Sequence, residues 1–216
     1  MKKIISFSLY NENIMYLEGI ICNIEIASII YPEWICRIYY DYTVPKSYID
    51  KINTYNNVET IDMSDSILSN KMSWRFLSID DSDVEIMLSR DADSRLSKRE
   101  KECVEIFKNS NYIFHDLRDH PCHNHFMGGM FGIKKNNLIK SFKDELLLFN
   151  LENIYGDDEK FLNYLIKKYI NDNLILKHDS NYDFENFPIK KSENKHFIGE
   201  VFPEHNFNRP YNTIFY

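Results

Sequence analysis

The stretch Val84-Glu85-Ile86-Met87-Leu88-Ser89-Arg90-Asp91-Ala92-Asp93 decides how the fold of this chain is interpreted. Its first half is apolar, which predicts a buried strand over 84–88. That strand leads directly into two carboxylates, one residue apart. Mg²⁺ and Mn²⁺ prefer oxygen ligands and leave positions open for phosphate oxygens. The stretch therefore predicts a metal and diphosphate site at the end of a strand, held by Asp91 and Asp93.

An Asp-x-Asp pair also has a simpler explanation. The two carboxylates can form a solvated turn that caps the following helix. Their position favours the metal site, because they follow the fourth predicted strand, where loops converge in sheets of this kind. Arg90 and Arg95 flank the pair and either contact phosphate or form ordinary salt bridges.

Working outward from this stretch, short apolar runs alternate with helical patterns. Strands are predicted at 3–9, 34–40, 58–63, 84–88, 112–115, 126–133 and 174–176. Helices are predicted at 13–31, 45–57, 71–79, 97–109, 136–148 and 157–170. Ser97 and Glu100 have the spacing of a capping box. This alternation predicts an α/β fold with a mixed, mostly parallel sheet flanked by helices.

The bulk composition narrows the classes of protein. The 216 residues fit one domain, with 44% hydrophobic and 27% charged residues. A net charge of −7 disfavours nucleic acid as a partner. No apolar run reaches the ~20 residues that a membrane span requires. The four cysteines form no CxxC pair, so we expect free thiols in a reducing cytoplasm.

Several longer motifs carry a resemblance to a known family. They are SFSLY at 6–10, YPEWICRIYYD at 31–41, WRFL at 74–77, RDADSRLSKRE at 90–100, HDLRDHP at 115–121 and GGMFG at 128–132. These motifs resemble a family of small glycosyltransferase-like proteins of viruses and bacteria. The resemblance implies a single Rossmann-like GT-A domain over 1–216, with a nucleotide-binding half at 1–95. An acceptor-side half and a C-terminal tail would occupy 96–216, and a viral origin would place the protein in host cytoplasm or virion.

The chain is also distantly similar to the glycogenin and retaining galactosyltransferase group. That similarity implies that the first strand and its loop hold the nucleotide base, and that a Gly-Gly segment lies near the donor sugar. The matching positions are Phe7, Ser8, Leu9, Tyr10, Gly128 and Gly129. A late histidine completes the metal shell in that group. His196 starts a partial match, HFIG, without the residues that should follow. His178, after a short predicted strand, is the preferred third ligand.

Three further groups of residues are candidates. Arg75 either reaches the donor or packs its stem beside Trp74, and Arg37 is a weaker candidate of the same kind. Acidic residues at 157–159 suit the first turn of a helix, and among them Asp158 is our candidate general base.

Residues 115–125 are dense in potential zinc ligands: His115, Asp119, His120, Cys122, His123 and His125. Their spacing matches no known zinc finger. We therefore interpret Asp119 and His120 as residues of the sugar pocket, with a zinc-dependent hydrolase as a weaker alternative.

The sequence thus predicts an enzyme that uses Mn²⁺ or Mg²⁺. It would move a sugar from a nucleotide-diphosphate donor, with UDP the expected nucleotide, to a hydroxyl of a glycan or other acceptor. The alternative is a non-catalytic relative that binds nucleotide sugars. The sugar, the acceptor and the oligomeric state stay open.

Overall fold

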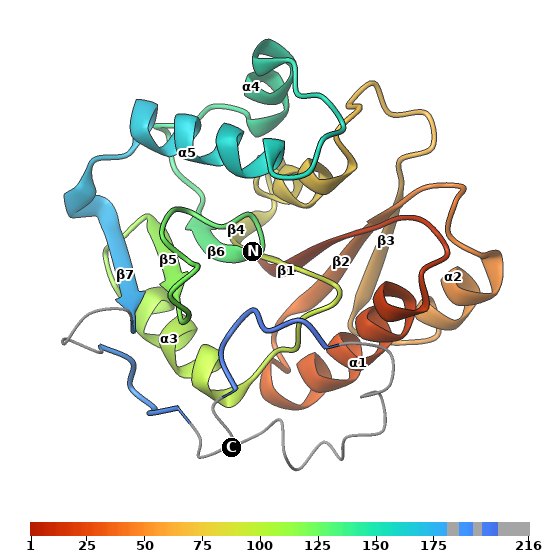
Figure 1. Cartoon of the computed structure of the whole chain (residues 1–216), viewed down its shortest axis with the longest axis horizontal. Helices are drawn as coiled ribbons and strands as arrows, with labels where there is room; N and C mark the ends of the chain where they lie inside the picture. Colours follow the sequence, from red (N-terminus) through yellow and green to blue (C-terminus); the bar gives the residue numbers. More distant parts are fainter. Residues whose placement is uncertain (181–185, 192–195, 203–216) are drawn as a thin grey trace.

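The computed structural model describes residues 1–180, 186–191 and 196–202. Within them, seven strands form one sheet in the order β3-β2-β1-β4-β6-β5-β7 (Figure 1). The strands are β1 (Lys2–Leu9), β2 (Ile35–Tyr40), β3 (Val58–Asp62), β4 (Val84–Arg90), β5 (Phe114–Arg118), β6 (Met130–Lys134) and β7 (Ile175–Asp179). The prediction of an α/β fold is confirmed.

The sheet is mixed and mostly parallel, as expected. Strands β3, β2, β1 and β4 run parallel, and β5 pairs with β7 in parallel. Strand β6 runs antiparallel to both β4 and β5. Arg90 at the end of β4 therefore pairs with Met130 at the start of β6. The carboxyl ends of β1 and β4 and the residues before β6 consequently share one edge of the sheet.

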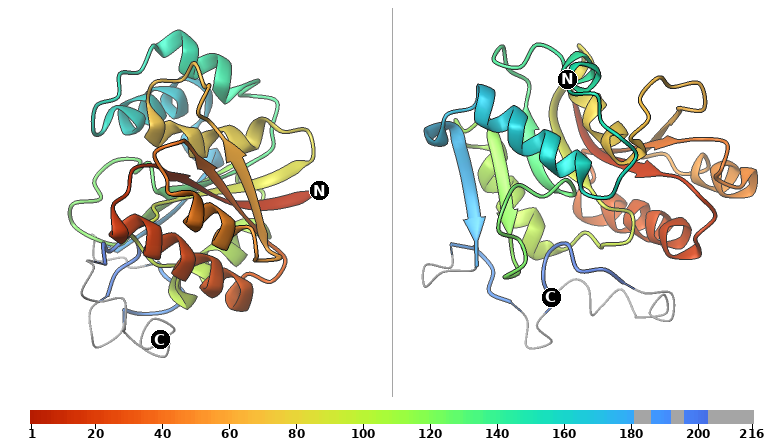
Figure 2. Two further views of the ribbon diagram at one scale, coloured as in Figure 1. Left: turned by 90° about the vertical axis from the view of Figure 1, so that its right-hand side faces the viewer. Right: turned by 45° about the horizontal axis from the view of Figure 1, so that its top comes forward.

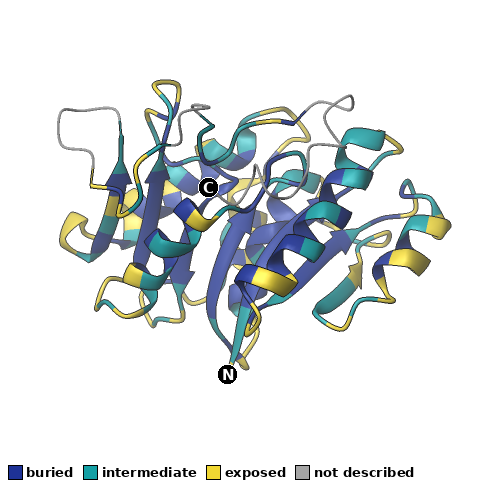
Figure 3. Cartoon of the chain, turned by 90° about the horizontal axis from the view of Figure 1, so that it is seen from below, coloured by how far each residue is buried: buried dark blue, intermediate teal, exposed yellow. Residues whose placement is uncertain are grey.

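Helices cover both faces of this sheet (Figure 2). They are α1 (Ile14–Ile30), α2 (Lys46–Ile52), η1 (Lys71–Asp80), α3 (Lys98–Lys108), α4 (Phe142–Phe149), α5 (Asp157–Tyr169) and η2 (Asp172–Leu174). One core cluster joins α1, α2 and α3 to the sheet, and a second joins η1, α4 and α5 to it. The central strands are buried on both faces, which explains their near-continuous apolar sequence (Figure 3).

Local signals explain most helix boundaries. Asn13 caps α1 by accepting a hydrogen bond from the Met15 N–H group. Ser97 caps α3 by accepting one from Glu100 N–H at 3.2 Å, which confirms the predicted start. Helix α4 begins later than the predicted 136, because Ser141 is its cap and the Asn136 side chain closes a turn before it. Residues 71–80 form a 3₁₀-helix rather than an α-helix.

Two simple expectations can be compared with this fold. All four cysteines are free thiols, as predicted. Among the described residues, every helix is too short or too polar to cross a bilayer.

Candidate functional site

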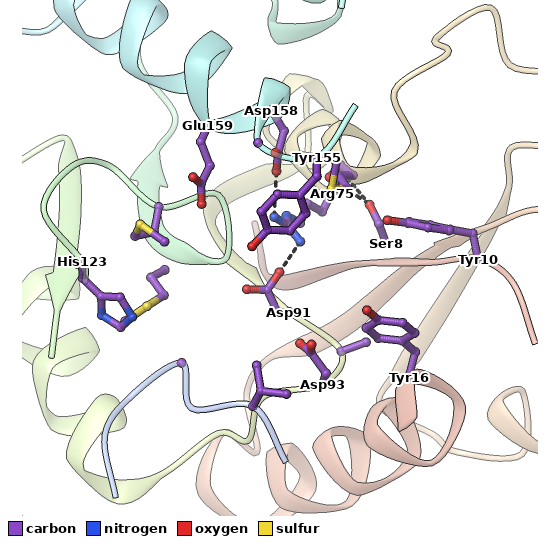
Figure 4. A pocket seen from close by; sticks show the side chains of 17 residues that line it. Ser8, Tyr10, Tyr16, Arg75, Asp91, Asp93, His123, Tyr155, Asp158 and Glu159 are labelled. Carbon is purple, nitrogen blue, oxygen red and sulfur yellow. Dashed lines mark hydrogen bonds and ion pairs between the residues drawn. The ribbon is translucent and has the colours of Figure 1, made fainter. Parts of the chain in front are cut away.

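A cavity of about 240 Å³ opens at the sheet edge where β1 and β4 end (Figure 4). Its walls come from β1, α1, η1, the loops after β4 and before β6, the start of α5 and residues 199–201. The described lining residues are Ser8, Tyr10, Tyr16, Met72, Arg75, Asp91, Ala92, Asp93, His123, Met127, Met130, Tyr155, Gly156, Asp158, Glu159, Gly199 and Val201. Segments far apart in the sequence therefore build one site.

Asp91 and Asp93 lie together in this cavity. Both follow β4 directly, and both line the cavity wall. Burial and then the neighbouring Asp91 charge raise the pKa of Asp93 to about 6. The main chain of this loop is fixed, since the Asp93 carbonyl accepts a hydrogen bond from Phe202 N–H at 2.9 Å. A cation beside the pair would offset the cost of keeping the buried Asp93 carboxylate ionised next to Asp91.

Arg75 links this pair to a third carboxylate. Its side chain is buried and forms ion pairs with Asp91 and with Asp158, the latter at 2.9 Å. The Arg75 main chain is held by Ser8, whose Oγ accepts the Arg75 N–H at 3.0 Å. Asp158 lies in the first turn of α5, and burial raises its pKa although Arg75 acts against this. The structure thus brings Arg75, Asp91 and Asp158 together in one network.

The two adjacent glycines lie directly against these carboxylates. A Cβ atom on Gly129 would be 1.8 Å from Asp91 Oδ2, and one on Gly128 would be 2.5 Å from Asp158 Oδ2. Both approaches are closer than any side chain allows. The Gly128 carbonyl also accepts a hydrogen bond from Ser89 Oγ at 2.6 Å, which fixes the loop. The segment therefore lies beside the Asp91 network because it lacks side chains.

Of the four residues predicted to hold the nucleotide base, only two line the cavity. Ser8 and Tyr10 line the cavity. Phe7 and Leu9 are buried in the core that faces α1, so their assignment to the nucleotide site was wrong. The reason is the two-residue period of a strand, which sends neighbouring side chains to opposite faces. Asp41 and Lys71 form an ion pair outside the described lining, and Lys71 Nζ lies 5.7 Å from the centre of the Tyr10 ring.

Arg90 is not a phosphate ligand in this structure. Its side chain is buried on the far face, where Nε donates to Glu100 Oε1 at 2.8 Å and a terminal nitrogen donates to the Phe131 carbonyl. Arg37 is likewise buried in ion pairs with Glu59 and Asp81, away from the cavity. Both arginines stabilise the fold, and neither lines the cavity.

The roles expected of Asp119 and His120 need correction. Asp119 is fully buried and pairs through both oxygens with Arg99, at 2.9 and 3.0 Å. It also accepts the Ile198 N–H at 3.0 Å and an ion pair from Lys191. Neither Asp119 nor His120 is among the described cavity residues. Asp119 instead anchors the segment that brings Gly199 and Val201 to the cavity.

The histidine that does reach the cavity is His123. Its Nδ1 accepts the Asp119 N–H at 3.3 Å, which places the proton of the neutral ring on Nε2. Burial lowers the pKa of His123 to about 4, so the ring is neutral at pH 7. His120 stacks on Phe197 instead. No local sequence signal separates these two histidines, because the path of the 119–129 loop decides which one turns inward.

The preferred third metal ligand, His178, lies elsewhere. It is in β7, three strands from β4, which corresponds to about 14 Å across the sheet. Its ring is buried, and Nδ1 is 2.8 Å from His115 Nε2. The alternative, His196, pairs with Glu200 at 2.6 Å and is not among the described lining residues. Placing His178 in the Asp91 and Asp93 metal shell was therefore wrong.

The zinc alternative also lacks a cluster. Among the described residues, no group of three or more His, Cys, Asp or Glu side chains is arranged to hold a metal ion. His115 turns into the core against His178, whereas Cys122 is exposed on the loop. The dense run of possible ligands is thus divided between the core and the surface.

A hard divalent cation nevertheless fits the Asp91 and Asp93 pair. Mg²⁺ in particular is bound by one or two carboxylates together with water and substrate phosphates, so a complete set of protein ligands is not required. Two acidic side chains face the same cavity here, with no lining lysine in the described part of the chain. The oxygen-only character of the pair suits Mn²⁺ or Mg²⁺ and disfavours soft metals.

Comparisons with known proteins agree with this architecture. No family model matches the chain, and no curated protein matches its sequence. Among solved structures, 4-diphosphocytidyl-2C-methyl-D-erythritol synthase of Anaerococcus prevotii aligns with a TM-score of 0.51 and 10% identity, covering 83% of this chain and 88% of that one. The fold is GT-A-like. A glycosyltransferase involved in glycosylation of the major capsid of PBCV-1 also aligns, with a TM-score of 0.48, 15% identity and coverage of 83% and 82%.

Proposed function

We propose that this GT-A-like protein is a metal-dependent glycosyltransferase that moves a sugar from a UDP-sugar to a hydroxyl of a glycan or other acceptor. The observation that carries the proposal is the placement of Asp91 and Asp93 in one cavity at the carboxyl edge of β4. Ligands of open α/β sheets bind at this edge. The GT-A-like fold agrees with a nucleotide-diphosphate donor, but by itself it does not choose the reaction.

Each part of the cavity has a proposed task. Ser8 and Tyr10 hold the nucleotide end, and Asp91 and Asp93 hold Mn²⁺ or Mg²⁺ with the diphosphate oxygens. When bound, the cation supplies a Lewis acid that offsets the charge of the departing diphosphate. Arg75 keeps the Asp91 carboxylate oriented through its ion pair.

Asp158 is the proposed general base of an inverting reaction, or the residue that assists a retaining one. Its carboxylate lines the cavity beside Gly128, and burial raises its pKa, which makes it a better proton acceptor than an exposed aspartate. The Arg75 ion pair keeps the group oriented within the cavity wall. A hydroxyl that approaches along α5 would meet this carboxylate.

Calorimetric titration with UDP in the presence and absence of Mn²⁺ tests the proposal. We expect UDP binding that depends on Mn²⁺ and is lost in Asp91→Asn and Asp93→Asn. Asp65→Asn is the matched control, because Asp65 is exposed and outside the cavity lining. UDP binding that ignores both Mn²⁺ and these substitutions would refute the metal site.

The non-catalytic alternative predicts the same binding without turnover. Release of UDP from UDP-glucose, measured with and without candidate acceptors, separates the two. Turnover that disappears in Asp93→Asn supports the enzyme. Tight, Mn²⁺-dependent UDP binding without any turnover supports the binding protein instead.

A further inference from the structure

The described lining of the cavity contains more negative than positive charge. Its described lining includes the carboxylates of Asp91, Asp93, Asp158 and Glu159, against the guanidinium of Arg75. With all four acids ionised, four negative charges face one positive charge and leave three in excess. The Arg75 guanidinium is already paired, because its two terminal nitrogens form ion pairs with Asp91 and Asp158. One divalent cation balances one diphosphate at most, so the excess persists in the loaded site.

The sheet order indicates which end of the cavity receives the donor sugar. Strand β4 lies between β1 and β6, so Asp91 is flanked by Ser8 and Tyr10 on one side and by Gly128 on the other. Figure 4 shows the same order, with Glu159 across Asp91 from Tyr10. Glu159 Oε1 also accepts the Gly128 N–H at 3.4 Å. A donor whose base lies at Tyr10 and whose diphosphate lies at Asp91 therefore extends its sugar toward Glu159.

Among the described lining residues, the sugar end offers no positive charge that could receive an anion. The described lining there combines the apolar side chains of Met127 and Met130 with the neutral ring of His123. Glu159 is half-buried, and its Oε2 is 3.0 Å from His125 Nε2 on the adjoining loop. A carboxylate introduced on the sugar would face Glu159 and Asp158 in a partly enclosed space, where water and salt screen repulsion poorly.

We propose, on the basis of the function proposed above, that the donor carries an uncharged sugar and that Glu159 and Asp158 reject sugars that carry a carboxylate. The chemical class is a neutral hexose or N-acetylhexosamine, and uronic acids are excluded. Rejection by like charge is a common way to obtain specificity, because it acts against one ligand without tightening the other.

UDP-glucose and UDP-glucuronate provide a matched pair of probes, since they differ only in a hydroxymethyl or a carboxylate at carbon 6. Calorimetric titrations of both, and of UDP, are carried out with Mn²⁺ at constant ionic strength. We expect UDP-glucuronate to bind at least about tenfold more weakly than UDP-glucose. In Glu159→Gln, we expect this ratio to fall severalfold while the affinity for UDP itself changes little.

Glu152→Gln is the matched control. It removes the same charge from an exposed position outside the cavity lining and should leave the ratio unchanged. Equal or tighter binding of UDP-glucuronate, with UDP still bound, overturns the sugar assignment alone. A ratio that Glu159→Gln does not move overturns the role of Glu159. Absence of UDP binding overturns the proposed function itself, so the two failures are distinguishable.

Discussion

Replacing Gly129 by alanine should disable the proposed metal site without unfolding the protein. The added Cβ atom would stand 1.8 Å from Asp91 Oδ2, whereas real Cβ contacts essentially never fall below 3.0 Å. The carboxylate must therefore move by at least about 1.2 Å. Metal–oxygen distances tolerate deviations of about 0.2 Å. A displacement of this size removes Asp91 from coordination and breaks its contact with Arg75.

The expected losses of turnover and of UDP affinity follow from this displacement. A misplacement of about 1 Å can cost on the order of 100-fold in turnover. We expect Gly129→Ala to weaken Mn²⁺-dependent UDP binding by at least about tenfold, the effect of losing about 1.4 kcal/mol of binding free energy. UDP titrations with Mn²⁺ measure the affinity, and near-ultraviolet circular dichroism verifies that the tertiary structure is intact.

Gly132→Ala serves as the control in the same segment. Its Cβ would meet a methyl group of Leu88 at 2.8 Å, in the core rather than in the cavity. It should lower stability and leave UDP affinity close to that of the wild type. If Gly129→Ala binds UDP with Mn²⁺ as tightly as the wild type, the Asp91 carboxylate does not participate in the site as argued.

Three other predictions concern the buried charges. Asp119→Ala should lower the free energy of unfolding by about 3–5 kcal/mol in urea denaturation, because it removes the carboxylate that pairs with the buried Arg99 guanidinium, whereas Asp119→Leu combined with Arg99→Met should recover most of this loss. Burial lowers the pKa of His178 to about 4, so the stability that the neutral ring contributes is present above pH 6.5 and is lost as the pH falls toward 4. His178→Gln should reduce this pH-dependent loss of unfolding free energy by up to about 3 kcal/mol, and His125→Asn should not. Arg75→Lys should weaken Mn²⁺-dependent UDP binding, because an ammonium does not bridge two carboxylates with the geometry of a guanidinium; wild-type affinity in the titration would contradict that role.

Sequence patterns that depend only on neighbouring residues predicted the fold and placed Asp91 and Asp93 at the end of a strand. The apolar run ending at Asp91 and Asp93 predicted both a strand and the position of the carboxylates beyond it. The alternation of strands and helices predicted the mostly parallel sheet. The helix start at Ser97 was predictable because a cap acts within one turn.

Errors arose where the direction of a side chain or a distant pairing decides its role. Arg90 precedes Asp91 by one residue, and the two-residue period turns it to the opposite face, where it meets Glu100. The same period separates Phe7 from Ser8, so alternation could have corrected both predictions. His178 could not be placed this way, because its position depends on β7 joining the sheet beside β5, a long-range pairing.

One buried arginine offsets part of the negative charge of the acidic cavity. Arg75 lies between Asp91 and Asp158 and compensates both, so the network has one cation for two buried or half-buried anions. Within the described part of the chain Asp93 forms no ion pair, and burial together with the Asp91 charge raises its pKa. A divalent cation beside Asp93 would supply the charge that Arg75 does not reach. In the proposed site, the two neighbouring aspartates would have different roles: Asp91 would couple the metal position to the buried Arg75 network, whereas Asp93 would supply the charge that recruits the metal.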